Sequence, residues 1–311
     1  MALLDPKAIL KLESMAVKAK CIVEGALTGM HRAKLRGSSV EFAEHKEYTR
    51  GDEIRHIDWK VLGKADRYYI KQFEQESELT CYLVVDASGS MSYQGKGVSK
   101  QTYACHLAAA LAYLLIGQQD RVGIRVFGDG ENDRFAPPRA KPTHLRTILN
   151  ILEETESKTN SGDESLSTVL ESVAEQARRR RGLVIILSDL FDSDKQPIKV
   201  MQHLRARGHD TVLFHLLDRD ELDFPFDGLS VFESLENDDK VLVDPASIRS
   251  LYKKRIEDFI DSSREQCLQA GIEYHLAVTD QPFETTLMNF LAGRLGMAGA
   301  RASGQTGRPS R

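Results

Sequence analysis

Three oxygen-bearing side chains, those of Asp86, Ser88 and Ser90, stand at alternate positions directly after an apolar run. That run, residues 80–85, is rich in β-branched and aliphatic residues, which predicts a buried strand. In open parallel sheets, ligands collect outside the carboxyl ends of the strands. Carboxylate and hydroxyl oxygens suit a hard divalent cation, so the loop predicts a site for Mg²⁺, with Mn²⁺ or Ca²⁺ as related candidates.

A second carboxylate follows another predicted strand. Residues 182–187 are apolar and are followed by Ser188 and Asp189, which a neighbouring parallel strand would bring to the same edge of the sheet. The two loops then offer two carboxylates and two hydroxyls, a partial shell that leaves room for another ligand. The alternative interpretation is that Ser88 and Ser90 cap the following turn and that Asp86 only ends a strand.

The composition narrows the class of protein. Of 311 residues, 41% are hydrophobic and 28% charged, which is ordinary for a soluble globular protein. The formal net charge is −4, and no segment is basic enough to make nucleic acid the expected partner. Four widely spaced cysteines without a Cys-x-x-Cys pair favour reduced thiols. With no signal-peptide pattern and no apolar run of membrane-spanning length, a cytoplasmic location is expected.

Three regions are predicted along the chain. Residues 1–78 combine a helix at 6–29 with a polar, charged segment packed on the main domain, residues 79–295 alternate strands with helices, and residues 296–311 form a disordered tail. Helices of this length between strands predict an α/β fold with a doubly wound, mostly parallel sheet, preceded by an N-terminal helix and extended segment.

Within the main region the expected elements can be placed by residue number. Strands are expected at 80–85, 121–127, 134–136, 183–188, 211–217 and 272–278, and helices near 99–117, 143–154, 165–180, 195–207, 246–270 and 283–295. An acidic linker at 218–227 and a hairpin at 230–243 precede the long helix at 246–270. The chain has no GxxxxGK[ST] loop, no GxGxxG after a strand and no GxSxG elbow, which argues against the enzyme classes built on these motifs.

The Asp-x-Ser-x-Ser loop and the order of strands and helices resemble the metal-ion-dependent adhesion site of von Willebrand factor A-type domains. The resemblance implies that Asp86, Ser88, Ser90 and Asp189 surround one divalent ion, whose open position takes a carboxylate from a protein partner. A threonine from a further loop completes the family's set. Here Glu164 stands at that position, with Ser165 as the neighbouring option.

A second motif precedes the sheet. Residues 41–60 mix opposite charges around the only tryptophan of the chain. This run resembles the signature of the domain of unknown function 58 family, whose members continue into an A-type domain. The matching residues are Tyr48, Gly51, Asp52, Arg55, Asp58 and Trp59. The family often occurs beside MoxR-type AAA+ ATPases, so the resemblance implies an adaptor that works with such an ATPase in the maturation or assembly of other proteins.

Two interpretations of this signature segment remain open. It is either a surface for a partner or a clamp that fixes the N-terminal segment onto the A-type domain, with Trp59 as its apolar anchor. The clamp is favoured, because a charged network such as Arg55 with Asp58 can hold a long polar loop.

Three hypotheses for function follow. The first is a non-catalytic, metal-dependent protein-interaction protein. The second is a Mg²⁺-dependent phosphohydrolase or phosphotransferase in which Asp86 is the nucleophile and Asp189 holds the metal. Such enzymes usually carry a second Asp two residues after the first, where this chain has Ser88. The third is a structural module without metal.

Overall fold

The computed structural model describes residues 14–35, 46–47, 69–70, 79–128, 134–157, 165–177, 181–191, 197–235 and 240–303. The chain divides into two compact units, residues 1–29 with 79–311, and residues 30–78. The N-terminal part of helix α2 (Met15–Leu35) therefore belongs with the larger unit. The boundary predicted at residue 78 joined that helix to the charged segment instead.

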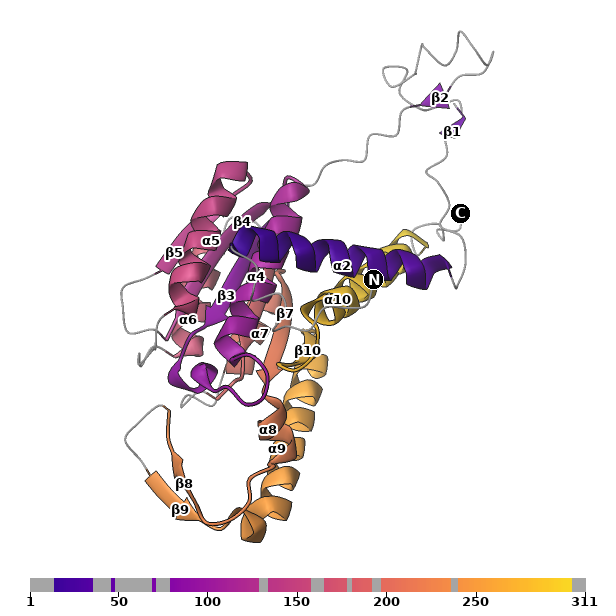
Figure 1. Cartoon of the computed structure of the whole chain (residues 1–311). Coiled ribbons are helices and arrows are strands. Elements are labelled where there is room, and N and C mark those ends of the chain that lie inside the picture. Colours follow the sequence, from indigo (N-terminus) through magenta and orange to yellow (C-terminus); the bar gives the residue numbers. More distant parts are fainter. Residues whose placement is uncertain are drawn as a thin grey trace. The chain divides into compact units, whose positions relative to one another are not determined.

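A six-stranded sheet forms the centre of the larger unit (Figure 1). In chain order its strands are β3 (Thr80–Asp86), β4 (Arg121–Phe127), β5 (Arg134–Arg139), β6 (Leu183–Ser188), β7 (Asp210–Leu217) and β10 (Glu273–Val278). In space they follow the order β10-β7-β6-β3-β4-β5. All neighbours are parallel except β4 and β5, so the predicted fold class, an α/β fold with a doubly wound and mostly parallel sheet, is confirmed.

The sequence of each strand explains its place in the sheet. Every residue of β3 is buried, and so is every residue of β6, as expected for central parallel strands covered on both faces. By contrast, β5 contains Pro137 and Pro138, which cannot donate to a ladder, and it lies at the edge.

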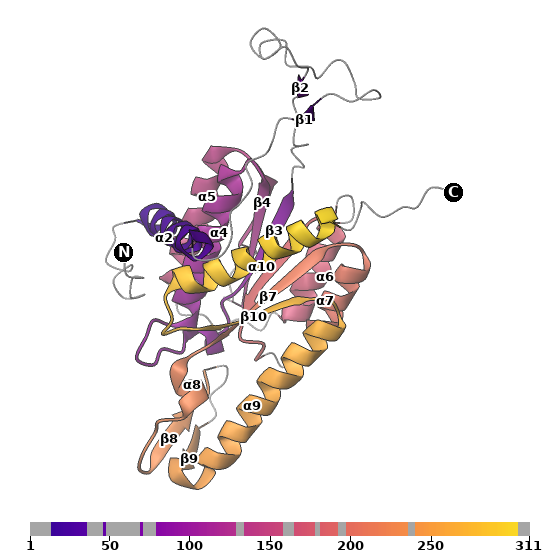
Figure 2. The ribbon, with the colours of Figure 1, turned by 90° about the vertical axis from the view of Figure 1, so that its right-hand side faces the viewer.

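Helices cover both faces of the sheet (Figures 1 and 2). On one face the apolar core includes side chains of α2, α4 (Lys100–Gly117), α5 (Pro142–Glu156) and α10 (Phe283–Ser303). On the other it includes α6 (Leu166–Gln176), α7 (Pro197–Ala206) and α9 (Pro245–Gln269). Period-two alternation divides β3 between them, because Leu83 enters the first core and Val84 the second.

Helix α2 uses a spaced apolar stripe to join the first core. Its buried residues recur at intervals of three and four, which places them on one face of a helix: Met15, Ala19, Ile22, Val23 and Ala26. The backbone N–H of Met15 also donates to Oε1 of Glu153 in α5, at 3.0 Å. The described part of α2 therefore packs on the first core of the larger unit.

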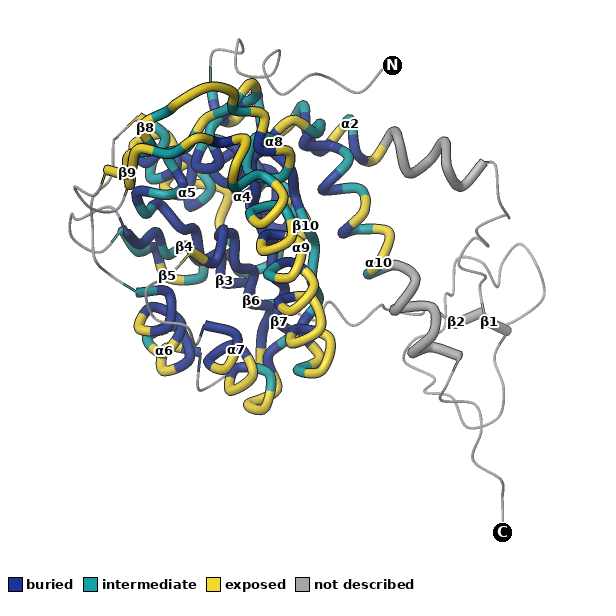
Figure 3. The backbone as a smooth tube through the Cα atoms, turned by 90° about the horizontal axis from the view of Figure 1, so that it is seen from below, coloured by how far each residue is buried: buried dark blue, intermediate teal, exposed yellow. Residues whose placement is uncertain are grey.

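Three elements differ from the predictions or refine them. The acidic linker contains a short helix, α8 (Arg219–Asp223), which was not anticipated. The expected hairpin is present as β8 (Ser230–Glu233) and β9 (Lys240–Val243). Helix α10 continues to Ser303, so residues 296–303 are helical where a disordered tail was expected. In Figure 3 the sheet is buried along most of its length, whereas β8 and β9 are largely exposed.

The smaller unit contributes one described pairing, between β1 (Lys46–Glu47) and the antiparallel β2 (Tyr69–Ile70). Both strands fall in the part of residues 1–78 for which an extended segment was expected. The six signature residues Tyr48, Gly51, Asp52, Arg55, Asp58 and Trp59 lie outside the described residues. Among the helices that are described, none is both long and apolar enough to cross a membrane.

Candidate functional site

Asp86 ends β3 at the carboxyl edge of the sheet and is only 4% exposed. The parallel register pairs Val85 with Leu187, which sets Asp86 beside Ser188 at the end of β6. The Ser188 hydroxyl donates to Oδ2 of Asp86 at 2.5 Å, and the backbone N–H of Ser88 donates to Oδ1 at 3.0 Å. The sheet therefore brings together the two loops that the sequence identified.

The electrostatic environment of Asp86 disfavours its charge. Burial, followed by the charge of Asp189, raises the pKa of the Asp86 carboxyl to about 7, although hydrogen bonds from Ser188 and Ser88 act in the opposite direction. A buried carboxylate with a neighbouring carboxylate is stabilised by a cation, which would compensate both charges.

The hydroxyls of Ser88 and Ser90 lie beside this carboxylate. Ser88 occupies the N-cap of the short helix η2 (Gly89–Ser92), but its side chain makes no capping hydrogen bond. Its Oγ lies 3.2 Å from Oγ of Ser90 instead. Adjacent ligands about 2.1 Å from an octahedral Mg²⁺ lie about 3 Å apart, so the two oxygens are spaced as such ligands are.

The structure adds a residue that the sequence analysis missed. Nζ of Lys100 lies 2.7 Å from Oδ2 of Asp189 and 2.6 Å from Oε1 of Glu221, and the Lys100 side chain is fully buried. The other oxygen of Asp189, Oδ1, accepts from the backbone N–H of Phe191 at 3.0 Å. Burial lowers the pKa of Lys100, but Asp189 and Glu221 outweigh it and raise the pKa, so the ammonium is charged.

Two helix N-termini position this ion-paired group. Lys100 is the first residue of α4, whose N-cap Ser99 accepts from the backbone N–H of Thr102 at 3.1 Å. Glu221 belongs to the capping box of α8, where its Oε2 accepts from the backbone N–H of Asp218 at 2.7 Å. An Asp followed three residues later by Glu is a capping-box signal, which could have revealed α8 from the sequence.

Further acidic groups make this edge electronegative. Asp218 follows β7, is fully buried, and accepts from Oγ1 of Thr279 at 2.6 Å. Burial, followed by the charges of Asp220, Asp218 and Glu221, raises the pKa of Tyr93 to about 12. The edge therefore attracts cations.

His215 lies next to Asp189 at the end of the sheet. Its Nε2 is 3.1 Å from the backbone carbonyl oxygen of Asp189, and its Nδ1 is 2.7 Å from the Tyr274 hydroxyl. Burial lowers the pKa of His215 to about 4, despite the opposing charge of Asp189. A neutral His215 therefore supports the Asp189 loop through its backbone, without adding a charge.

The residues fit the ion that the resemblance implies. Asp86, Ser88, Ser90 and Asp189 come from the two predicted loops and provide only oxygen donors, as Mg²⁺ requires. Among the described residues, no three His, Cys, Asp or Glu side chains form a metal-binding group. Of the three acidic residues in the predicted set, only Asp86 and Asp189 are described. The third-loop candidate, Glu164, lies outside the described residues, and neighbouring Ser165 caps α6 by accepting from the backbone N–H of Thr168.

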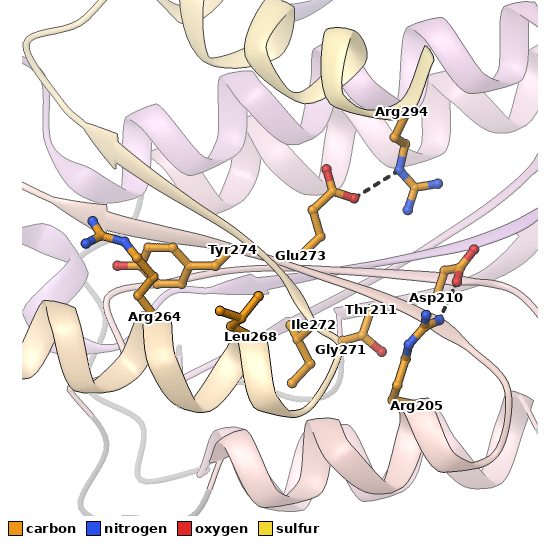
Figure 4. Close-up of a pocket in the computed structure, with 10 residues that line it drawn as sticks. All are labelled: Arg205, Asp210, Thr211, Arg264, Leu268, Gly271, Ile272, Glu273, Tyr274 and Arg294. Atoms are coloured by element: carbon orange, nitrogen blue, oxygen red, sulfur yellow. Dashed lines mark hydrogen bonds and ion pairs between the residues drawn. The ribbon is translucent and has the colours of Figure 1, made fainter. Parts of the chain in front are cut away.

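A cavity of about 620 Å³ lies elsewhere, at the amino ends of β7 and β10 (Figure 4). Each of its three arginines already has an acidic partner, and that of Arg264 is Asp261, outside the lining. Arg205 pairs with Asp210, and Nε of Arg294 lies 3.4 Å from Oε2 of Glu273. Because these charges are compensated, the cavity offers no strong anion site, and the polar groups at the opposite edge remain the candidate site.

The chain is similar to proteins of mycobacteria. It is 28% identical over 235 residues to the uncharacterized protein Rv1480 of Mycobacterium tuberculosis, covering 75% of this chain and 72% of that protein. The same identity and coverage relate it to Mb1516 of Mycobacterium bovis.

Three solved structures are also similar. BatB from Bacteroides thetaiotaomicron matches with a TM-score of 0.45 and 10% identity, over 69% of this chain and 98% of that chain. An aerotolerance-related membrane protein from Bacteroides fragilis matches with a TM-score of 0.46 and 13% identity, over 70% and 99%. The manganese-loaded TRAP protein of Plasmodium vivax matches with a TM-score of 0.36 and 19% identity, over 45% and 57%.

The family assignment rests on the sequence itself. The profile of the family described as protein of unknown function DUF58 matches residues 44–260, well over half of the chain. This range contains the signature around Trp59 together with the Asp86 and Asp189 loops. The chain therefore belongs to the DUF58 family.

Proposed function

We propose that this protein is a non-catalytic, metal-dependent adaptor that binds another protein through the carboxyl edge of its sheet. The observation that carries the proposal is the environment of Asp86, a buried carboxylate that faces a second carboxylate and two hydroxyls. A divalent cation compensates such a group better than hydrogen bonds alone do.

Asp86, Ser88, Ser90 and Asp189 are the residues that would hold the ion. When bound, Mg²⁺ supplies a coordination position for an acidic side chain of a partner. Lys100 has a separate role, because its ammonium compensates Asp189 and Glu221 whether or not a metal is present. Asp86 is then the carboxylate at this edge whose charge a bound metal ion would compensate most.

The identity of the partner rests on the family resemblance. We propose a MoxR-type AAA+ ATPase or its client, with the adaptor acting in the maturation or assembly of other proteins. The acidic character of the edge in the absence of metal would repel an acidic partner surface, so metal would be required for binding.

The second hypothesis, a phosphohydrolase that uses Asp86, has less support. A nucleophile must reach its substrate, whereas Asp86 is 4% exposed and accepts hydrogen bonds from Ser188 and Ser88. Ser88 also stands where such enzymes usually carry their general acid. If hydrolysis of p-nitrophenyl phosphate by wild type disappears in Asp86→Asn, the enzyme hypothesis replaces the adaptor.

Calorimetric titration of Mg²⁺ and Mn²⁺ into EDTA-treated protein tests the proposed site. We expect saturable binding by wild type and loss of it in the double variant Ser88→Ala, Ser90→Ala. The matched control is Ser92→Ala in the same loop, because its hydroxyl donates to the Gly89 carbonyl at 2.6 Å. Binding that survives the double variant, or that Ser92→Ala removes equally, would contradict the site.

A further inference from the structure

An arm built from β8, β9 and the start of α9 carries most of the exposed apolar side chains of the described residues. Six of the ten large hydrophobic residues that are exposed fall within residues 229–251. They are Leu229, Val231, Leu235, Val241, Leu242 and Leu251. A concentration of this kind marks an interaction surface, whereas single exposed apolar residues need no explanation.

The arm is anchored by aromatic side chains on one of its faces. The ring centroid of Phe224 lies 4.3 Å from the ring centroid of Tyr252 in α9 and 5.8 Å from that of Phe232 in β8. Phe226 packs edge-on against Phe232, with ring centroids 5.4 Å apart. An isolated two-stranded hairpin is only marginally stable, so this cluster is what holds the arm in place.

The opposite face carries aliphatic side chains without such packing. Val231 and Leu242 are cross-strand partners and therefore share a face, while Phe232 points the other way. Val231 is 56% exposed and Leu242 is 62% exposed. Glu233 and Lys240 form an ion pair of 2.7 Å on the same face. A folded and anchored strand pair thus presents an apolar strip flanked by charge.

The charges in and beside the arm are mostly negative. Among the described residues of 218–235 and 240–244, seven are acidic and two are basic. A partner that buries the strip must also accommodate this negative rim. A partner segment with aliphatic residues beside lysine or arginine would bury the strip and compensate the negative charges. A second copy of this chain would bring like charges together, and an anionic lipid surface would be repelled.

The position of the arm connects it to the candidate site. The arm follows β7 at the carboxyl edge of the sheet, and α8 at its base holds Glu221, which pairs with Lys100 (Figure 2). A protein bound along the arm would therefore lie at the same end of the sheet as Asp86 and Asp189.

We propose that the outer face of the arm binds a basic amphipathic segment of a partner protein, with Val231 and Leu242 as its central contacts. The inference goes beyond the proposed function, because it names a second surface and the chemistry of what binds there. It requires no metal, so measurements in EDTA separate its failure from failure of the metal site.

The probe is a synthetic amphipathic helix of leucine and lysine, with a matched helix in which glutamate replaces lysine. Binding to the full chain is measured by fluorescence anisotropy in EDTA. We expect the lysine helix to bind and the glutamate helix not to bind. In Val231→Thr, Leu242→Thr, which keeps good strand formers, affinity for the lysine helix should fall by about tenfold or more.

Two further variants make the result specific. Leu268→Gln removes a still more exposed leucine, 77% exposed, on α9 outside the arm and should leave affinity unchanged. Asp223→Lys with Glu233→Lys should weaken binding of the lysine helix without removing any aliphatic contact. Circular dichroism and the Tm of each variant check that it is folded.

Several outcomes would overturn the proposal. One is equal affinity of the lysine helix for wild type and the threonine variant, which would mean binding by charge alone. Others are no binding by wild type, a dimer in sedimentation that the threonine variant abolishes, or arm-dependent binding to phosphatidylcholine vesicles. The last two would assign the arm to a second copy or to lipid.

Discussion

Nζ of Lys100 lies 2.7 Å from Oδ2 of Asp189, and neither side chain is exposed. The two residues are 89 positions apart, one at the start of α4 and the other directly after β6. This ion pair occupies a carboxylate that the family resemblance assigns to a metal. Any metal at this edge must therefore share Asp189 with an internal ammonium, which makes Lys100 a determinant of both stability and metal affinity.

Lys100→Met should destabilise the protein by about 3–5 kcal/mol, because it leaves Asp189 and Glu221 buried without their cation. Urea unfolding monitored by circular dichroism measures the change. Lys20→Met is the control, since Lys20 forms an exposed pair of 3.7 Å with Glu24 and should change stability by about 0.5 kcal/mol or less. Equal small effects of both substitutions would contradict the role given to the buried pair.

Asp86→Asn should stabilise the metal-free protein at pH 8 by about 1–3 kcal/mol, because it removes an uncompensated buried charge. The folded-state pKa of Asp86, about 7, is above the unfolded value of 3.8. Between these values the folded state binds the additional proton, so the contribution of Asp86 to stability decreases as pH rises. Unfolding from pH 4 to 8 measures this, with exposed Asp261→Asn as control.

His215 should make the protein more stable as pH rises, the opposite of Asp86, and over an overlapping pH range. Its folded-state pKa, about 4, is below the unfolded value of 6.5, so the unfolded state takes up the proton first as pH falls. Stability due to neutral His215 is then lost between about pH 6.5 and pH 4. We expect this loss of stability to be clearest in Asp86→Asn, because that variant lacks the opposite pH dependence of Asp86. The loss should become smaller in the double variant Asp86→Asn, His215→Asn. A flat profile for Asp86→Asn would refute it.

Mg²⁺ affinity should increase with pH through about 7, because the metal requires the ionised form of Asp86. Below that pH the apparent association constant for Mg²⁺ should fall by about tenfold for each pH unit. Calorimetry at pH 5.5, 6.5 and 7.5 would measure it. Affinity that does not change over this range would exclude Asp86 as a ligand.

The signature segment yields a prediction that rests on sequence alone. If it is a clamp, Arg55→Ala and Asp58→Ala should each lower stability by about 1 kcal/mol, the scale of a lost charge-assisted contact. Fluorescence of Trp59, the only tryptophan, follows this segment directly during urea unfolding. Unchanged stability together with weaker binding of a MoxR-type ATPase would favour the partner surface instead.

Local patterns were sufficient to predict the main strands and helices. The runs that form β3 and β6 are easily recognised as strands, because both strands are buried on two faces and their sequences are almost continuously apolar. The N-terminal stripe of α2 was likewise visible as periodicity, and the hairpin of β8 and β9 was also expected at residues 230–243. The end of α10 was misplaced because Gly296 and the small residues after it are typical of a helix end.

Sequence by itself determined the fold class, the Asp86 and Asp189 loops and membership of the family, because these depend on residue type and on spacing along the chain. Only the tertiary structure decided that Ser188 donates to Asp86 and that Lys100 pairs with Asp189. Such contacts join residues about a hundred positions apart, and they exist because a parallel sheet aligns the carboxyl ends of strands that are distant in sequence. The exposure of Val231 and Leu242 was decided in the same way, by which face of the hairpin the aromatic cluster occupies.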